Sequence, residues 1–191
     1  MIGIFNHKRR WVGIVAGLSL SVLAVTSVGA QTAEIVQSIT GGGQPTVTIN
    51  AVSLTAASYS TDEQYSPGQL GYTINAESGT APGWSVSVQA GDLIYSGEHG
   101  GVNVPAANLS VSAANAPGYV SGDPIDPANG PFAPAGGATG PLDQPRTVLV
   151  ANDGYGDGSY NQNLNLSLAI PGGASPGSYS GTITFTVVAG P

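Results

Sequence analysis

The chain has 191 residues, of which 11 are Asp or Glu and only four are Lys or Arg, so its net charge is −7. It contains no cysteine, which excludes disulfide bonds and thiolate metal sites. Binding to nucleic-acid backbones needs clustered Lys and Arg, so this composition also excludes a nucleic-acid-binding protein.

The first thirty residues have the pattern of a secretory signal peptide. A basic HKRR stretch precedes an apolar run over residues 11–25, and small residues then suit cleavage after Ala30. An uncleaved anchor is the alternative, because the uncharged run over 11–32 is long enough to span a bilayer. We expect cleavage and a secreted protein without membrane contact. The mature chain then carries one cation, Arg146, against all 11 carboxylates, a net charge of −10.

The rest of the sequence alternates between apolar and polar residues with the period of β-strands. Strands are predicted over residues 34–39, 46–55, 70–77, 84–90, 108–113, 146–151, 163–170 and 179–188. Leu164, Leu166 and Leu168 alternate with Asn and Ser, which is typical of an antiparallel sheet with one buried and one wet face. Because two such sheets bury their apolar faces against each other, we predict an all-β antiparallel β-sandwich of about eight strands.

The alternation is interrupted in two places. Within 46–55 the apolar positions change parity, which predicts a β-bulge near Asn50. Residues 114–145 carry seven prolines and six glycines, too many for a strand. We expect a long surface loop there with polyproline-II character, pinned to the domain by Tyr119 and Phe132.

These features divide the chain into three parts. Residues 1–30 are the signal peptide, and residues 31–45 form an N-terminal strand and a Gly-rich linker. Residues 46–191 form one β-sandwich domain, with 114–145 as a loop insertion. A chain of this length can bury an ordinary hydrophobic core without disulfide bonds.

The residues that could carry catalysis do not form a typical active site, and we expect no enzyme. His99 is the one histidine after the signal peptide, and it lies in a Gly-rich turn. The paired carboxylates all fall in predicted loops: Asp62 with Glu63, Asp92 with Glu98, and Asp123 with Asp126. Solubilising surface charge explains these pairs, while a hydrolase or carbohydrate-binding accessory module that uses them is a further alternative.

The segment over residues 152–163 begins like an oxygen-ligand loop, with Asp153 and Asp157 four residues apart. It is not an EF-hand, because Tyr155 occupies a ligand position and Leu164 stands where the bidentate Glu belongs. Two interpretations stay open. One is a looser calcium site that uses both aspartates and backbone carbonyls, and the other is a Gly-rich hairpin turn without a cofactor.

Trp84 begins a predicted strand and shares its face with Val86 and Val88, while Ser85 and Ser87 lie on the other face. This alternation favours an indole in the core that covers one end of the sandwich. The alternative is an exposed platform for sugar rings, because the first residue of a strand lies near the rim.

Two stretches resemble a known family. GYTINAESGTAPGWSVSV over 71–88 resembles the first half of the WxL domain, a bacterial cell-surface domain named for its Trp-x-Leu motifs. LNLSLAIPGGASPGSYSGTITFTVVAGP over 164–191 is similar to the closing segment of that domain, and the resemblance covers most of 46–191. The motifs differ from the family pattern. WSV at Trp84–Val86 stands for the first motif, and FTV at Phe185–Val187 stands for the second.

The resemblance implies a protein that attaches non-covalently to peptidoglycan at the cell surface, beside other surface proteins. It implies that Trp84, Val86, Tyr179, Phe185 and Val187 are motif or ligand-binding residues. Neither a lipidation cysteine after the signal peptide nor a sortase motif is visible, which agrees with non-covalent attachment. The alternative is a structural subunit that self-associates into a fibre or surface layer, because low charge leaves edge strands open to pairing.

Overall fold

The computed structural model of the protein describes residues 31–32 and 44–190. Within these ranges the chain forms antiparallel strands, loops and one 3-10 turn, η1 (Ala106–Asn108). The predicted all-β fold is confirmed, while the predicted signal peptide and the predicted strand over 34–39 lie outside the described residues. No helix in the described ranges has the length and apolarity needed to cross a membrane.

The larger layer of the fold is a seven-stranded sheet. Its main path runs through β1 (Gln31–Thr32), β2 (Thr46–Leu54), β3 (Gln64–Asn75), β10 (Gly158–Ile170), β6 (Leu109–Ala114) and β8 (Gly140–Pro141). The seventh strand, β7 (Gly118–Gly122), pairs with the beginning of β10. The central pair of β3 and β10 is in unbroken register from Asn75 opposite Ser159 to Gln64 opposite Ile170.

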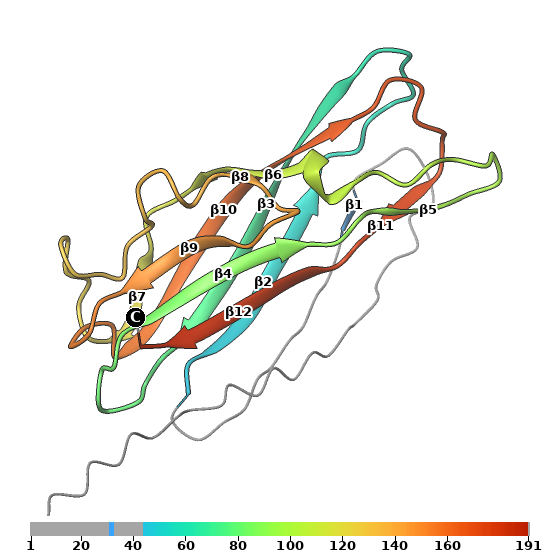
Figure 1. The fold of residues 1–191 in the computed structure, drawn as a ribbon. Helices are drawn as coiled ribbons and strands as arrows, with labels where there is room; N and C mark the ends of the chain where they lie inside the picture. Colours follow the sequence, from blue (N-terminus) through green and yellow to red (C-terminus); the bar gives the residue numbers. More distant parts are fainter. Residues whose placement is uncertain (1–30, 33–43, 191) are drawn as a thin grey trace, which may run out of the picture.

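The facing layer is a three-stranded sheet in the order β12 (Ile183–Ala189), β4 (Trp84–Ala90), β9 (Arg146–Ala151). Figure 1 shows this sheet lying across β2, β3 and β10, so the predicted β-sandwich is confirmed. A two-stranded ribbon of β5 (Ile94–Ser96) and β11 (Ser178–Ser180) extends from one end of the small sheet (Figure 1).

Alternating side chains fill the space between the layers. Leu164, Leu166 and Leu168 of β10 are buried, and they share one core cluster with Trp84 and Val86 of β4. Full burial of a large apolar side chain stabilises the fold by roughly 1.5–3 kcal/mol. The intervening residues of β10 are less buried Asn and Ser, so the alternation in the sequence produces the wet face that it predicts.

The predicted bulge in the second strand is confirmed. The pairing of β2 with β3 shifts register between Ile49 and Ala51. The extra residue, Asn50, uses its side-chain amide to donate a hydrogen bond to Thr73 Oγ1 at 2.8 Å. Ile49 before the shift and Val52 after it are both buried, because the extra residue restores their common face.

The last predicted strand, over 179–188, is two strands in the structure. β11 ends at Ser180 and pairs with β5, whereas β12 begins at Ile183 and pairs with β4. Between them the chain passes from the ribbon to the small sheet, where Thr182 O accepts a hydrogen bond from Gly91 N at 2.9 Å. The prediction of one strand is wrong because the polar–apolar alternation continues through a change of pairing partner.

The Pro-rich segment over 114–145 belongs to the fold more fully than predicted. It contains β7 and β8, and Leu142 within it is fully buried. Leu142 N donates to Leu109 O in the large sheet at 2.8 Å, and Leu142 O accepts from Ala90 N in the small sheet at 2.8 Å. The prediction of a simple surface loop is wrong because β7 contains no proline, and β8 is an edge strand that tolerates Pro141.

Phe132 pins this segment to the domain, as predicted. Its backbone N–H donates to Val150 O at 2.9 Å and its carbonyl accepts from Val150 N at 3.0 Å. Tyr119 is 54 % exposed, yet its ring meets the edge of the buried Tyr160 ring with centroids 6.5 Å apart. Both aromatic residues therefore contact the sandwich, Phe132 through its backbone and Tyr119 through its ring.

One polar side chain connects the two layers through the core. Gln162 of β10 is 2 % exposed, and its Oε1 accepts a hydrogen bond from the Tyr72 hydroxyl. Its Nε2 donates to Asn115 O at 2.8 Å and to Val148 O at 3.1 Å. Burial raises the pKa of Tyr72, because the phenolate would lose its hydration, so the hydroxyl remains a donor.

Candidate functional site

Trp84 lies at one end of the sandwich core rather than on the surface. The side chain is 1 % exposed, and its Nε1–H donates to Gly156 O at 2.9 Å. Its ring centroid lies 6.2 Å from that of Tyr160. The core interpretation of Trp84 is confirmed, and the exposed sugar platform is wrong, because an indole enclosed in this way cannot contact a ligand.

Two loops that cross between the layers close the end of the core above Trp84. They join β3 to β4 and β9 to β10. Asp157 Oδ1 accepts from Ser78 N at 2.8 Å, and Gly154 N donates to Ala81 O at 2.8 Å, so the two loops hold each other. Of the two interpretations of residues 152–163, the hairpin turn is wrong: the segment connects two sheets, since β9 and β10 belong to different layers.

The calcium candidates in this turn are not joined by a third acid. Asp157 is engaged with a backbone N–H, and Asp153 is exposed. Across the described ranges no three His, Cys, Asp or Glu side chains gather as a metal-binding group. Gly154 and Gly156 have φ of +82° and +77°, which fits a tight glycine turn. The geometry gives this segment a structural role in closing the core.

The residues implied by the family resemblance fall into two groups. Trp84, Val86 and Phe185 are buried, and Val187 is half-buried against the same core. The two motif segments are neighbours in the small sheet, with Val86 opposite Val187. Tyr179 is separate from them, because it lies on the β5–β11 ribbon. Four of the five residues therefore build the core, and only Tyr179 lies near a surface where a ligand can bind.

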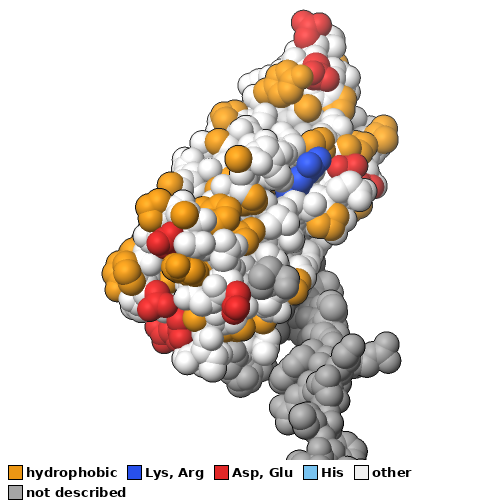
Figure 2. Space-filling view, turned by 60° about the vertical axis from the view of Figure 1, so that its left-hand side comes forward, with side chains coloured by type: hydrophobic (Ala, Val, Ile, Leu, Met, Phe, Trp, Pro, Cys, Tyr) orange, Lys and Arg blue, Asp and Glu red, His pale blue; other side chains and the backbone are white. Residues whose placement is uncertain are grey.

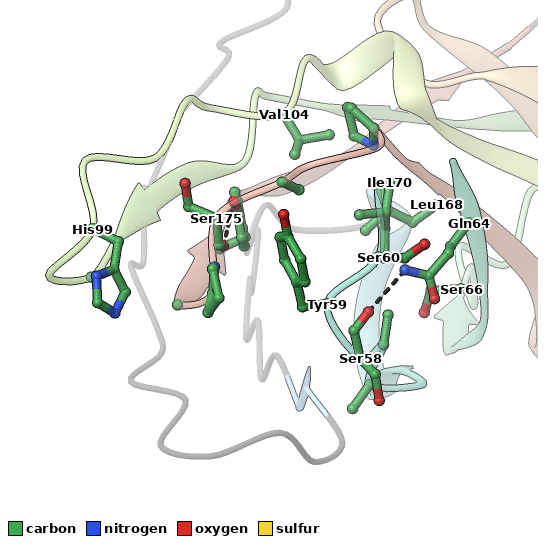
Figure 3. Close-up of a pocket in the computed structure, with 18 of the residues that line it drawn as sticks. Ser58, Tyr59, Ser60, Gln64, Ser66, His99, Val104, Leu168, Ile170 and Ser175 are labelled. Carbon is green, nitrogen blue, oxygen red and sulfur yellow. Dashed lines mark hydrogen bonds between the residues drawn. The ribbon is translucent and has the colours of Figure 1, made fainter. Parts of the chain in front are cut away.

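His99 stands at the tip beyond β5 and is exposed. Its backbone N–H donates to Tyr95 Oη at 3.2 Å, while Figure 3 shows its imidazole at the outer rim of a groove, turned away from Ser58 and Ser175. Among the described residues no hydroxyl hydrogen-bonds to this imidazole. The histidine is therefore not arranged as the base of a nucleophilic serine.

Two of the carboxylates from the predicted pairs hold loops. Asp92 Oδ1 accepts from Ala106 N at 2.8 Å, at the start of the 3-10 turn. Asp126 accepts from the backbone N–H groups of Ala128 and Asn129, both at 2.8 Å, and these bonds lower the pKa of its carboxyl. Both side chains act as caps for backbone groups.

A groove of about 490 Å³ opens at the end of the sandwich opposite Trp84. It lies where β3 begins and β10 ends, between the β2–β3 loop, the tip beyond β5 and the loop before β11. Figure 3 shows Tyr59 pointing into its middle. The polar or aromatic residues that line it include Ser58, Tyr59, Ser60, Gln64, Ser175 and Tyr179.

Hydrogen bonds fix the loops that form the groove walls. Gln64 Nε2 donates to Ser58 O at 2.8 Å and shapes the β2–β3 loop (Figure 3). Gly173 N donates to Ser60 O at 2.8 Å, which joins that loop to the one before β11. Two loops that are distant in the sequence thus form one continuous wall.

Two tyrosines whose rings contact each other at a tilt of 59° support the wall on the ribbon side. The rings of Tyr95 and Tyr179 have centroids 5.2 Å apart, and Tyr95 Oη donates to Pro176 O at 3.0 Å. A Cβ on Gly101 or Gly177 would lie 2.7 Å or 2.5 Å from the Tyr95 ring, so both positions need glycine. Burial, with a smaller contribution from Tyr95, raises the pKa of Tyr179. The packed rings of Tyr95 and Tyr179 thus hold this wall of the groove in place.

The chemistry of the groove is mixed. Val104, Leu168 and Ile170 supply apolar surface, while serine hydroxyls and a glutamine amide supply hydrogen-bonding groups. Tyr59 is 63 % exposed and offers a bare ring. The one carboxylate in the lining is Glu98, at the same rim as the imidazole. Such a surface suits an uncharged ligand that has both apolar faces and hydroxyl or amide groups.

The family resemblance pointed to Tyr179, whereas no motif or periodicity in the sequence pointed to Tyr59. Residues 56–63 lie between two predicted strands and show no periodicity, so no pattern marked them. The available signal was the position of this tyrosine: ASYST places it among serines in a predicted loop, and loops carry a large share of binding residues.

Comparison with protein families, curated proteins and solved structures gives no match for this chain. The resemblance to the WxL domain therefore stays a prediction from the quoted motifs.

Proposed function

We propose that this is a secreted, non-catalytic bacterial surface protein that attaches non-covalently to the cell wall through the groove around Tyr59. The observation that supports the proposal is an exposed tyrosine ring among serine hydroxyls, above an apolar floor. The sugar rings of peptidoglycan have apolar C–H faces for an aromatic ring, and their hydroxyl and acetamido groups match serine and glutamine partners.

The charge of the protein narrows the class of wall polymer. Figure 2 shows one face of the molecule, with a single small cationic spot and separated acidic groups on a mainly uncharged surface. After the predicted cleavage the acidic chain would be repelled by anionic wall polymers, because its one remaining cation, Arg146, does not compensate for 11 carboxylates. The uncharged glycan backbone of peptidoglycan is therefore the ligand that we propose.

Co-sedimentation of the purified protein with wall sacculi tests this proposal. We expect the wild-type protein to pellet with sacculi, and Tyr59→Ala to bind about tenfold more weakly, because loss of an aromatic contact of ~1–1.5 kcal/mol corresponds to that factor. Far-ultraviolet circular dichroism establishes that the variant is folded.

Tyr65→Ala is the matched control. Tyr65 is 68 % exposed, but it is absent from the groove lining although its neighbours Gln64 and Ser66 line it. We expect this variant to bind like wild type. Failure of the wild-type protein to pellet, or equal loss in both tyrosine variants, would contradict the proposal.

As a second function we propose self-association of copies of this chain at the cell surface. The observation that favours it is an edge strand of the small sheet, β12, which carries neither charge nor proline.

A further inference from the structure

Among the described strands, β12 is an edge strand of the small sheet. Within the described residues β4 pairs with one side of β12, and no strand pairs with the other side. The register with β4 is unbroken over the whole strand, so β12 contains no bulge. Bulges, charges and prolines are the features that protect edge strands, and β12 lacks all three. By contrast β2, the strand of the large sheet that lies nearest to β12, is bulged and follows Pro45.

Two hydrogen bonds fix which backbone groups face this edge. Gly91 N donates to Thr182 O, and Gly190 N donates to Gly83 O, both at 2.9 Å. In an antiparallel pair, alternate residues bond to the partner strand and the residues between them point away. The even-numbered residues of β12 therefore bond to β4. The backbone N–H and C=O groups that point to the outer edge belong to Ile183, Phe185, Val187 and Ala189.

We propose that two copies of this chain pair through their β12 strands, antiparallel about a two-fold axis at Thr186. The proposal names the partner and the contact for the self-association proposed above, and it does not depend on the ligand of the groove. Each small sheet would join that of the other copy to make one continuous sheet.

The strand is complementary to itself in this register. Pairing over its full length puts Phe185 opposite the second copy's Val187, and Ile183 opposite the second copy's Ala189. All four residues with outward backbone groups then meet one another, so no outward N–H or C=O lacks a partner. Aromatic and β-branched residues form favourable cross-strand pairs. The register that pairs the two strands over their full length is thus also one in which the outward N–H and C=O groups of the two copies face each other.

The other face of the strand is also self-compatible. In the dimer Thr186 would lie opposite Thr186 of the second copy, and Thr184 opposite Val188 of the second copy. Thr184, Thr186 and Val188 are all exposed in the single chain. Facing threonine hydroxyls can hydrogen-bond. The strand itself carries no charge, so the carboxylates elsewhere on the chain do not meet at the contact. A second copy is therefore a better occupant than a charged partner.

Sedimentation equilibrium of the purified protein tests the pairing. We expect a monomer–dimer equilibrium for wild type. Thr186→Lys and Thr186→Glu each place like charges face to face across the axis, and we expect each to weaken the dimer by on the order of tenfold. A one-to-one mixture of the two variants should restore dimers, because lysine then faces glutamate. Gln69→Lys, on the exposed face of the central strand β3, adds the same charge elsewhere and should leave the equilibrium unchanged.

The outcomes separate this proposal from the others. A wild-type protein that is monomeric at every concentration, as it would be if another part of the chain covered β12, overturns the pairing. The register is wrong if neither Thr186→Lys nor Thr186→Glu weakens the dimer. It is also wrong if a mixture of these two variants does not restore dimers. Open filaments in place of dimers overturn the two-fold closure. Binding to sacculi is a separate measurement, so failure of the groove proposal leaves these results unaffected.

Discussion

The indole of Trp84 fills the end of the core and also supplies the hydrogen bond for a loop carbonyl. This close approach requires glycine on the loop side: a Cβ at Gly156 would lie 3.0 Å from the indole nitrogen, and φ there is +77°. Gly83, beside the indole, has φ of +69°, and a Cβ there would lie 2.8 Å from Asp153 N. The GW dipeptide and the GYG turn therefore function as one unit, although 72 positions separate Trp84 from Gly156.

Ionisation of Tyr160 is expected to lower the stability of the fold at alkaline pH. Its hydroxyl donates to Asp123 O at 2.7 Å; burial, followed by the charges of Asp123 and Asp157, raises its pKa from 10.0 to about 12. A raised folded-state pKa stabilises the fold fully below pH 10 and loses that contribution as the pH rises through about 12. We expect the free energy of unfolding to fall in this window, and Tyr160→Phe to make the fall shallower. Urea unfolding at a series of pH values measures it.

The control for this prediction is Tyr59→Phe, which changes an exposed tyrosine. The slope of that variant should match wild type. The Tyr72 hydroxyl, whose pKa burial also raises, leaves part of the slope in place when Tyr160 is replaced. If the free energy of unfolding of Tyr160→Phe fell with pH as steeply as that of wild type, the Tyr160 hydroxyl would not be the cause of the alkaline dependence.

At the scale of elements, Gln162 joins three strands and the segment after β6. Gln162→Leu leaves the buried Tyr72 hydroxyl and Val148 carbonyl without this partner, as well as the part-buried carbonyl of Asn115, and each unpaired buried group costs about 1–3 kcal/mol. We expect a loss of at least ~2 kcal/mol in the free energy of unfolding, measured with urea. Gln69→Leu, at an exposed position on β3, should change it by less than ~0.5 kcal/mol. Similar losses in the two variants would contradict the role of the buried amide.

The sequence predicted well those strands in which the run of alternating apolar and polar residues begins and ends where the strand itself does. β4 and β9 begin and end at the predicted residues, because polar outer faces and Gly or Pro boundaries mark them. β7 and β8 were missed because pairing with a distant strand, rather than local composition, makes them strands. Alternation also cannot reveal that β11 and β12 belong to different sheets.

The candidate site was predictable only in part. Tyr179 came from the family resemblance, whereas Tyr59 lies in an aperiodic loop that tertiary hydrogen bonds hold in place. The burial of Trp84 followed from its strand parity, since its face is shared with Val86 and Val88. Local patterns therefore predicted the core side of each strand, but they did not predict which loops meet at an end of the sandwich.

At the scale of the whole molecule, net charge opposes any contact between copies. After the predicted cleavage each chain would carry a charge of −10, so two copies would repel each other, while the proposed β12 contact contains no ion pair. We expect the dimer to become several-fold tighter when salt rises from about 10 mM to about 100 mM, because the Debye length then falls from about 30 Å to about 10 Å. Sedimentation equilibrium at the two concentrations measures this effect. A dimer that weakens with salt would indicate ion pairing and contradict the proposed contact.

The groove lies at the end where β3 begins and β10 ends, whereas the β12 edge runs along the side of the sandwich. In an antiparallel pair the two grooves would therefore face in opposite directions, one at each far end. A dimer of this shape is bivalent and linear, so it can cross-link two separate glycan layers. Avidity, rather than a tighter individual site, would then determine how strongly the protein is retained.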